Sequence, residues 1–345
     1  MRERKYTLPR HTNLAKQGAR TGAFFIDLAI GVALTLAFYF GCFNLIFKSK
    51  VTTCQNIVNK EKEASGLFIK KDGDYDILDR PEDHTKFEKK LVYFYLEYFP
   101  GKTLAGESKK QEKHDIRWFN KNILEINENN KDSIYTYNEG NKDVIGVPNK
   151  NVVEDELRDF IFEKYANTIM YKFYKIDFVQ AANVEEMGYH SISFTASSFI
   201  GLGLVYILLP WILKNGQSVG KKVFKLGLAS SDGYKMKNRQ LFMRFLPLGV
   251  CSLTLFLFYL VNLYIVLSIY LIIFLVSFAL TMASPKKMSL HDFTAQTIVV
   301  DLASSTIFEN EIDEEAHILK EENDEVSDVF KDDEEGEEPE LKYEK

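Results

Sequence analysis

An arginine and an aspartate stand seven residues apart where a long apolar segment begins: Arg20 and Asp27. Asp27 is the only charged residue between Ala23 and Phe47. About 20 apolar residues suffice to cross a bilayer as a helix, so a membrane span over 23–47 is favoured over a buried helix of a soluble protein. Acids inside spans are costly, usually paired and often functional. Asp27 is therefore a candidate proton- or cation-sensitive group.

The spacing also constrains the partner of Asp27. Arg20 and Asp27 share a helix face, but about 10 Å of helical rise separates them. Because helical side chains point toward the N-terminus, we expect Arg20 to point into the cytoplasm and Asp27 toward the inner interface. A direct bridge between the two would be strained. We expect Arg244, at the entry to a third apolar segment, to pair with Asp27, with Arg239 and Lys222 as the next candidates.

A second acid follows the last apolar segment, in the run Leu290-His291-Asp292-Phe293. Together with Ser289, Asp292 fits a capping box, in which the acid is the third helical residue. This structural role is favoured for Asp292, with a functional charge as the alternative. For His291 an ordinary interfacial histidine is the favoured interpretation, with a proton relay as the alternative.

A glycine-containing loop, Gly216-Gln217-Ser218-Val219-Gly220-Lys221-Lys222, superficially resembles a phosphate loop. It is one residue short of the Walker spacing, and Lys222 stands where Ser or Thr should bind magnesium. We therefore do not expect nucleotide binding. The favoured interpretation is a turn whose cations contact lipid phosphates, through Lys221, Lys222 and Lys225.

These three motifs, in this order relative to the apolar segments, resemble the RDD family of bacterial membrane proteins, named for one arginine and two aspartates. The resemblance covers residues 15–47 and 191–300, and it places Arg20, Asp27 and Asp292 on the family's named positions. It implies a multi-pass membrane protein, and transport, including cation/proton exchange, has been suggested for members. The long insertion after the first span and the acidic tail depart from the family pattern, so the resemblance implies nothing about them.

Charge is distributed unevenly along the chain. The net charge of -6 includes a C-terminal part, 301–345, with 19 acidic side chains against 4 lysines. Basic residues crowd 1–22 and 214–246, which the positive-inside rule places in the cytoplasm. We therefore expect a cell-membrane protein with both termini cytoplasmic. The acidic tail has few aromatic residues and is expected to be disordered.

The apolar stretch from Leu246 to Ala283 is too long for one span and favours a hairpin of two short spans turning near Asn262. The expected fold class is an all-α polytopic membrane protein with about four transmembrane helices. The expected order is a basic N-terminus (1–22), the first span (23–47), an extracytoplasmic insertion (48–190), the second span (191–213), a basic cytoplasmic loop (214–246), the hairpin (247–283), the cytoplasmic Leu-His-Asp segment (284–300) and the tail (301–345).

Local patterns predict the smaller elements. Helical periodicity marks 86–99, 111–126 and 152–174 in the insertion. Strand-like runs occur at 223–229 and 297–300, and 234–237 can return as a second strand after the first run. If 223–229 and 297–300 pair, both lie on one face of the membrane, which requires the hairpin. Small residues at helical spacing allow another helix to approach closely. One set is Ala29, Ala33, Ala37 and Gly41, for which the helix propensity of alanine is an equally favoured explanation. Another is Ser197 and Gly201.

Two functions remain open. The first is transport of a small solute or ion, with Asp27 as the intramembrane acid; four spans would then favour a homo-oligomer. The second is a membrane-embedded binding or scaffold protein that acts through its extracytoplasmic domain and acidic tail. An enzyme is not expected, because no nucleophile–base pair is apparent. No metal, cofactor or nucleic-acid partner is implied, and the expected partners are anionic membrane lipids.

Overall fold

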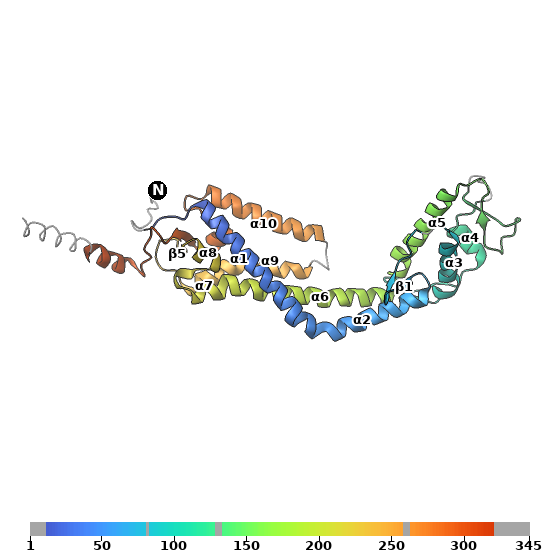
Figure 1. The fold of residues 1–345 in the computed structure, drawn as a ribbon, viewed down its shortest axis with the longest axis horizontal. Helices are drawn as coiled ribbons and strands as arrows, with labels where there is room; N and C mark the ends of the chain where they lie inside the picture. The colour runs from blue at the N-terminus through green and yellow to red at the C-terminus, as the bar shows by residue number, and fades with distance from the viewer. Residues whose placement is uncertain (1–11, 81–82, 128–132, 258–262, 321–345) are drawn as a thin grey trace, which may run out of the picture. The chain divides into compact units, whose positions relative to one another are not determined.

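The computed structural model describes residues 12–80, 83–127, 133–257 and 263–320 (Figure 1). The chain divides into two compact units. The first consists of the described parts of Met1–Leu45 and Ser191–Lys345, and the second is Ile46–His190. Each unit is described by itself.

Two long apolar helices lie partly in the first unit and partly in the second. One is continuous from Gln17 to Ser65, as α1 (Gln17–Phe38), η1 (Tyr39–Phe43) and α2 (Asn44–Ser65), so it extends well beyond the span expected at 23–47. The other comprises α6 (Asp177–Gly203), η4 (Leu204–Leu208) and α7 (Leu209–Ile212). Gln17–Ser65 and Asp177–Ile212 are long and apolar enough to cross a membrane, and only 22% and 28% of their apolar windows are buried. That exposure is unlike the core helix of a soluble protein.

The apolar stretch that begins at Leu246 forms two helices rather than one. Helix α9 (Asn238–Leu257) and helix α10 (Leu263–Ala283) contact each other (Figure 1). The expected turn near Asn262 lies outside the described residues. Both helices occur where the hairpin was predicted, and the number of membrane crossings is taken up as a proposal below.

A two-stranded antiparallel sheet lies in the first unit. Strand β5 (Leu226–Ser230) pairs with β6 (Thr297–Asp301), and Leu228 lies opposite Val299, so the two strand candidates do pair. The first strand begins later than expected because residues 219–223 form the short helix α8 (Val219–Val223) and Lys225 then turns the chain with a φ of +54°. The expected strand at 234–237 is reduced to a bridge between Ala229 and Lys235.

Helix α1 packs through one narrow face. Its buried residues recur every fourth position, at Ala23, Asp27, Gly31 and Thr35. The small residues predicted for packing lie on the exposed part of the helix: Ala29, Ala33, Ala37 and Gly41. Of the two explanations, the exposure favours the helix propensity of alanine, because the face that buries Asp27 turns inward. The Ser197 and Gly201 prediction is confirmed, since a Cβ on Gly201 would lie 2.8 Å from the backbone nitrogen of Thr35.

The start of the acidic tail is ordered, contrary to expectation. Residues 311–320 are helical. Tyr234 donates a hydrogen bond to Glu314 at 3.0 Å, and Lys235 donates one to Glu309 at 2.5 Å. The expectation of disorder over 301–345 is therefore wrong for residues 301–320, because some acidic side chains find partners. The rest of the tail lies outside the described residues.

The second unit is a helical domain with two small hairpins. It contains residues 46–65 of α2 and 177–190 of α6. Its other helices are α3 (Thr85–Tyr93) extended by η2 (Phe94–Tyr98), α4 (Ile116–Asn122), and α5 (Glu154–Thr168) extended by η3 (Ile169–Phe173). Strands β1 (Ile69–Lys71) and β2 (Asp74–Asp76) form one hairpin, and β3 (Tyr135–Thr136) pairs with β4 (Val147–Pro148). Large buried side chains form its core: Phe87, Phe94, Phe119, Tyr135, Tyr165 and Phe173.

The helices predicted at 86–99 and 152–174 are confirmed, whereas the one predicted at 111–126 is shorter. Helix α4 begins only after Asp115, whose side chain accepts a hydrogen bond from the backbone N–H of Trp118 at 2.8 Å. Aspartate is a strong N-cap residue because its oxygen satisfies a free N–H of the first turn. The cap fixes the helix start inside the periodic stretch.

Candidate functional site

Asp292 lies in the first turn of α11 (Leu290–Ala295), and its side chain has no exposed surface. The backbone N–H and the hydroxyl of Ser289 donate hydrogen bonds to Oδ2 of Asp292, at 3.2 and 2.6 Å. The predicted capping box is therefore confirmed. It fixes the direction of the carboxylate, because two bonds from the N-cap residue hold it against the helix start.

Two arginines from different helices converge on this carboxylate. Arg20 donates from Nη2 to Oδ2 of Asp292 at 2.9 Å and also bonds the carbonyl oxygen of Lys287. Arg244 donates from Nη1 to Oδ1 of Asp292, and to the hydroxyl of Thr297 at 2.8 Å. Their side chains are only 9% and 7% exposed. One buried acid thus joins α1, α9 and α11.

This arrangement corrects two expectations. Arg20 turns into the protein rather than into the cytoplasm, and Arg244 pairs with Asp292 rather than with Asp27. The physical reason is competition between acids: Asp292 is held by its cap within reach of both guanidinium groups, while Asp27 has donors of its own. An ion pair inside a low-dielectric region needs such extra hydrogen bonds to offset the cost of desolvation.

Asp27 is bound by the glycine-containing loop. Its Oδ1 accepts from the backbone N–H of Gly220 at 2.8 Å, and its Oδ2 accepts from the hydroxyl of Ser218 at 2.5 Å. Ser218 is the N-cap residue of α8, and Gly220 is in the first turn, so Asp27 satisfies an N–H that has no partner within the helix. The contact requires glycine, because a Cβ on Gly220 would lie 2.1 Å from the carbonyl oxygen of Ala23.

The predicted lipid contact by Lys221 is wrong, because Lys221 is only 8% exposed. Within the described ranges, no hydrogen bond or ion pair involves its side chain. Burial lowers the pKa of Lys221 to about 7, Arg244 adds to the decrease, and Asp27 and Asp292 oppose it. Lys222 and Lys225 are exposed, as a lipid contact requires.

His291 lies at the edge of the cluster. Its Nε2 is 3.8 Å from Oδ1 of Asp292, and both ring nitrogens lie within hydrogen-bonding distance of the hydroxyl of Ser289. Burial lowers the pKa of His291, and the charge of Asp292 only partly opposes this. Burial alone would raise the pKa of Asp292, but the charges of Arg244 and Arg20, together with the hydrogen bond from Ser289, outweigh burial and hold it well below its usual range. At neutral pH the aspartate is ionised and the histidine is neutral.

Three participants were missed by the sequence analysis: Ser218, Thr297 and Tyr206. Ser218 lies inside the recognised loop, and its position before a helix start was an available signal. Tyr206, in η4, carries a buried hydroxyl with no hydrogen-bond partner among the described residues, within electrostatic reach of Asp27 and Arg244. Nothing in the spacing of the chain links Tyr206 or Thr297 to the acids. In the described parts of the chain, no group of three or more His, Cys, Asp and Glu could hold a metal ion.

The long, largely exposed apolar helices and the buried ion cluster point to a membrane protein. The model of the RDD family matches residues 161–296, which confirms the resemblance found in the sequence. The matched range contains the glycine-containing loop, Arg244 and Asp292. Arg20 and Asp27 lie outside the matched range, but Arg20 is hydrogen-bonded to Asp292 and Asp27 to Gly220, which lie inside it. No curated protein and no solved structure matches the chain.

Proposed function

We propose that the protein moves a small solute or ion across the cell membrane, with cation/proton exchange as the favoured form. In this proposal α9 and α10 also cross, giving four spans with both termini in the cytoplasm. Asp27 is the intramembrane acid, and Lys221 beside it is the group that exchanges a proton. The observation that carries the proposal is a lysine buried near two acids without a hydrogen bond or ion pair to any described residue.

The charges of the cluster support this role. It combines the cations of Arg20, Lys221 and Arg244 with the carboxylates of Asp27 and Asp292, so ionised lysine leaves one positive charge in excess. Arginine keeps its proton at any accessible pH, whereas a buried lysine can lose it near neutrality. A cation entering beside Asp27 would repel the lysine proton. Binding of a cation and release of a proton are thereby coupled.

The test is flux in proteoliposomes. The purified chain is reconstituted with a pH-sensitive dye inside, and Na⁺, K⁺ or Ca²⁺ is added outside. We expect cation-driven proton efflux, its loss in both Asp27→Asn and Lys221→Met, and its retention in Lys222→Met, which removes an exposed neighbouring charge. Size-exclusion profiles show that each variant is folded. A wild-type rate no higher than that of protein-free liposomes, for every cation, contradicts the proposal.

The second candidate is a membrane-embedded binding protein that acts through residues 48–190 and the acidic tail. A polar cavity within the second unit favours it. Under the transport proposal four helices leave little room for a path, so we expect a homo-oligomer. Crosslinking in native membranes distinguishes the two functions. Transport predicts crosslinked oligomers of this chain, whereas the binding function requires no assembly.

A further inference from the structure

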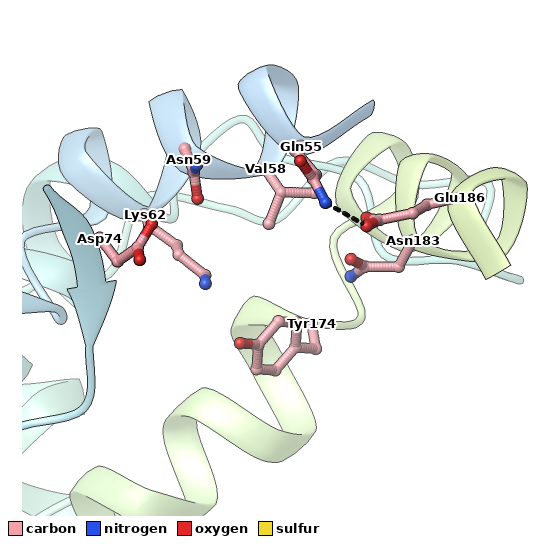
Figure 2. A pocket seen from close by; sticks show the side chains of 8 residues that line it. All are labelled: Gln55, Val58, Asn59, Lys62, Asp74, Tyr174, Asn183 and Glu186. Atoms are coloured by element: carbon pink, nitrogen blue, oxygen red, sulfur yellow. Dashed lines mark hydrogen bonds between the residues drawn. The ribbon is translucent and has the colours of Figure 1, made fainter. Parts of the chain in front are cut away.

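The second unit contains an open cavity of about 300 Å³. Its walls come from α2, β2, the segment after η3, and the first turns of α6 (Figure 2). The lining residues are mostly polar: Gln55, Val58, Asn59, Lys62, Asp74, Tyr174, Asn183 and Glu186. A cavity of this size, with polar groups that converge on it, is the usual form of a small-molecule site.

Opposite charges line this cavity without pairing. Lys62 lies over the ring of Phe68, 5.4 Å from its centroid, and forms no ion pair within 4.0 Å with any described carboxylate. Asp74 likewise has no ion pair or side-chain hydrogen bond among the described residues, although it lines the same cavity. Figure 2 shows Lys62 and Asp74 on one side and Glu186 on the other. A ligand that carries both charges can satisfy groups that do not satisfy each other.

The remaining polar groups favour amide or carboxylate chemistry. Glu186 accepts a hydrogen bond from Gln55 at 2.7 Å, which fixes its carboxylate at the cavity edge. The side chains of Asn59 and Asn183 make no hydrogen bond to another described residue, and each offers a donor and an acceptor. The apolar contribution is small, from Val58 and the ring of Tyr174. A large apolar ligand would therefore leave these groups unsatisfied.

We propose that this cavity binds a small zwitterion of the amino-acid type, with its carboxylate at Lys62 and its ammonium at Asp74. Charge-assisted hydrogen bonds of this kind are stronger than neutral ones and give orientation as well as affinity. The inference rests on the cavity alone and does not require that the protein transports anything. It gives the second unit a receptor function that the ion cluster of the first unit does not explain.

Equilibrium binding to the full chain in nanodiscs, without any gradient, tests this inference. The probes are the twenty standard L-amino acids, each measured by isothermal titration. The amino acid that binds most tightly is compared with its N-acetyl derivative, which lacks the ammonium, and its α-amide, which lacks the carboxylate. We expect each derivative to bind at least about tenfold more weakly, as expected for the loss of a charge-assisted hydrogen bond.

Variants locate the site. Lys62→Gln should weaken the parent amino acid but leave the α-amide unchanged, and Asp74→Asn should weaken the parent but leave the N-acetyl derivative unchanged. Lys60→Gln, an exposed neighbour on the same helix, is the matched control and should bind like the wild type. Absence of binding by all twenty probes at 10 mM (about 2.7 kcal/mol on the affinity scale), or equal loss in Lys60→Gln, overturns the inference. The proteoliposome flux measurement tests the transport proposal separately, so the failure of one proposal can be told from the failure of the other.

Discussion

The guanidinium of Arg244 and the carboxylate of Asp292 form an ion pair whose side chains are only 7% and 0% exposed. The pair joins α9 to α11, and Arg20 brings α1 to the same acid. Taking charges out of water is expensive, and only close geometry with further hydrogen bonds offsets the cost. Thr297 and Ser289 supply those bonds. The arrangement holds three helices through one carboxylate, so its loss should affect the whole unit.

Breaking this pair from either side should destabilise the protein strongly. Asp292→Asn should cost about 3–5 kcal/mol, because it leaves the buried Arg20 and Arg244 without a carboxylate. Arg244→Gln should cost less, because Arg20 still pairs with Asp292. The double variant should lose less than the sum of the two. Unfolding in detergent, followed by intrinsic fluorescence, measures this. Arg239→Gln, an exposed arginine on the same helix, is the control and should be close to neutral. Strictly additive losses would show that the two side chains do not interact.

Adding one methyl group to the loop should disrupt the Asp27 contact. In Gly220→Ala the new Cβ would meet the carbonyl oxygen of Ala23, so α8 must move away from α1. We expect a loss of about 1–3 kcal/mol from overpacking. Gly18→Ala, where nothing lies within 4 Å, should instead be neutral or stabilising by about 0.5–1 kcal/mol, because alanine favours the helix. Thermal melting of the two variants in the same detergent compares them. Similar melting temperatures would contradict this account.

The sequence allowed local features to be predicted, but not which charges meet. The capping box of Ser289 and Asp292 follows from residues within one turn. The strands themselves follow from short strand-like runs at 223–229 and 297–300, but the sequence left their pairing open. Three long-range contacts decide the cluster instead: Arg20 with Asp292, Arg244 with Asp292, and Asp27 with Gly220. Spacing predicted that Arg20 and Asp27 would not bridge each other. It could not show that the partner of Asp27 would be the backbone N–H of Gly220 rather than a cationic side chain.

The buried face of α1 was also not predictable from local spacing. Alanines at regular spacing looked suited to packing, yet Ala29 and Ala33 are exposed and the stripe with Asp27 and Gly31 is buried. For a membrane helix, an alanine-rich face has no preference between lipid and protein, whereas an acid must be satisfied within the protein. Asp27 therefore decides which face turns inward.

Topology can be read by cysteine labelling in intact cells. Lys109→Cys, in the second unit, should react with an impermeant maleimide from outside, and Lys237→Cys should react only after the membrane is opened. Both lysines are exposed. Lys102 would be a poorer position for the cysteine, because its side chain donates a hydrogen bond to Glu61 at 3.1 Å. Background from the exposed Cys42 is removed by Cys42→Ser. Labelling of Lys237→Cys from outside would refute the four-span arrangement.

The exposed lysines beside α8 should prefer anionic lipid. Lys222 and Lys225 are both exposed, and each basic residue near a membrane surface contributes about 1 kcal/mol at low salt. The double variant Lys222→Gln with Lys225→Gln should therefore weaken the preference for anionic over zwitterionic lipid, measured by native mass spectrometry of bound lipid. Lys109→Gln with Lys110→Gln is the control of equal charge loss. The preference should also fall with added salt; an unchanged preference in the first variant excludes these contacts.

Burial of Lys221 should make stability depend on pH. Its pKa is lowered from 10.5 to about 7 in the folded protein. Between these values the unfolded chain binds the proton and the folded protein does not, so stability rises as pH increases from about 7 to 10.5. Below about pH 7 both states are protonated, and the full cost of the buried charge, a few kcal/mol at most, is present.

Lys221→Met removes this cost because methionine carries no charge. The variant should be more stable than the wild type below pH 7, and the advantage should shrink steadily toward pH 10. Denaturant unfolding of the two proteins at intervals between pH 6 and 10 measures the difference, in which other titrating groups cancel. Lys222→Met, which removes the exposed lysine next in the chain, is the control for the loss of a lysine at this place. A constant difference for Lys221→Met would mean that Lys221 keeps an ordinary pKa, and the proton-exchange role assigned to it would then be wrong.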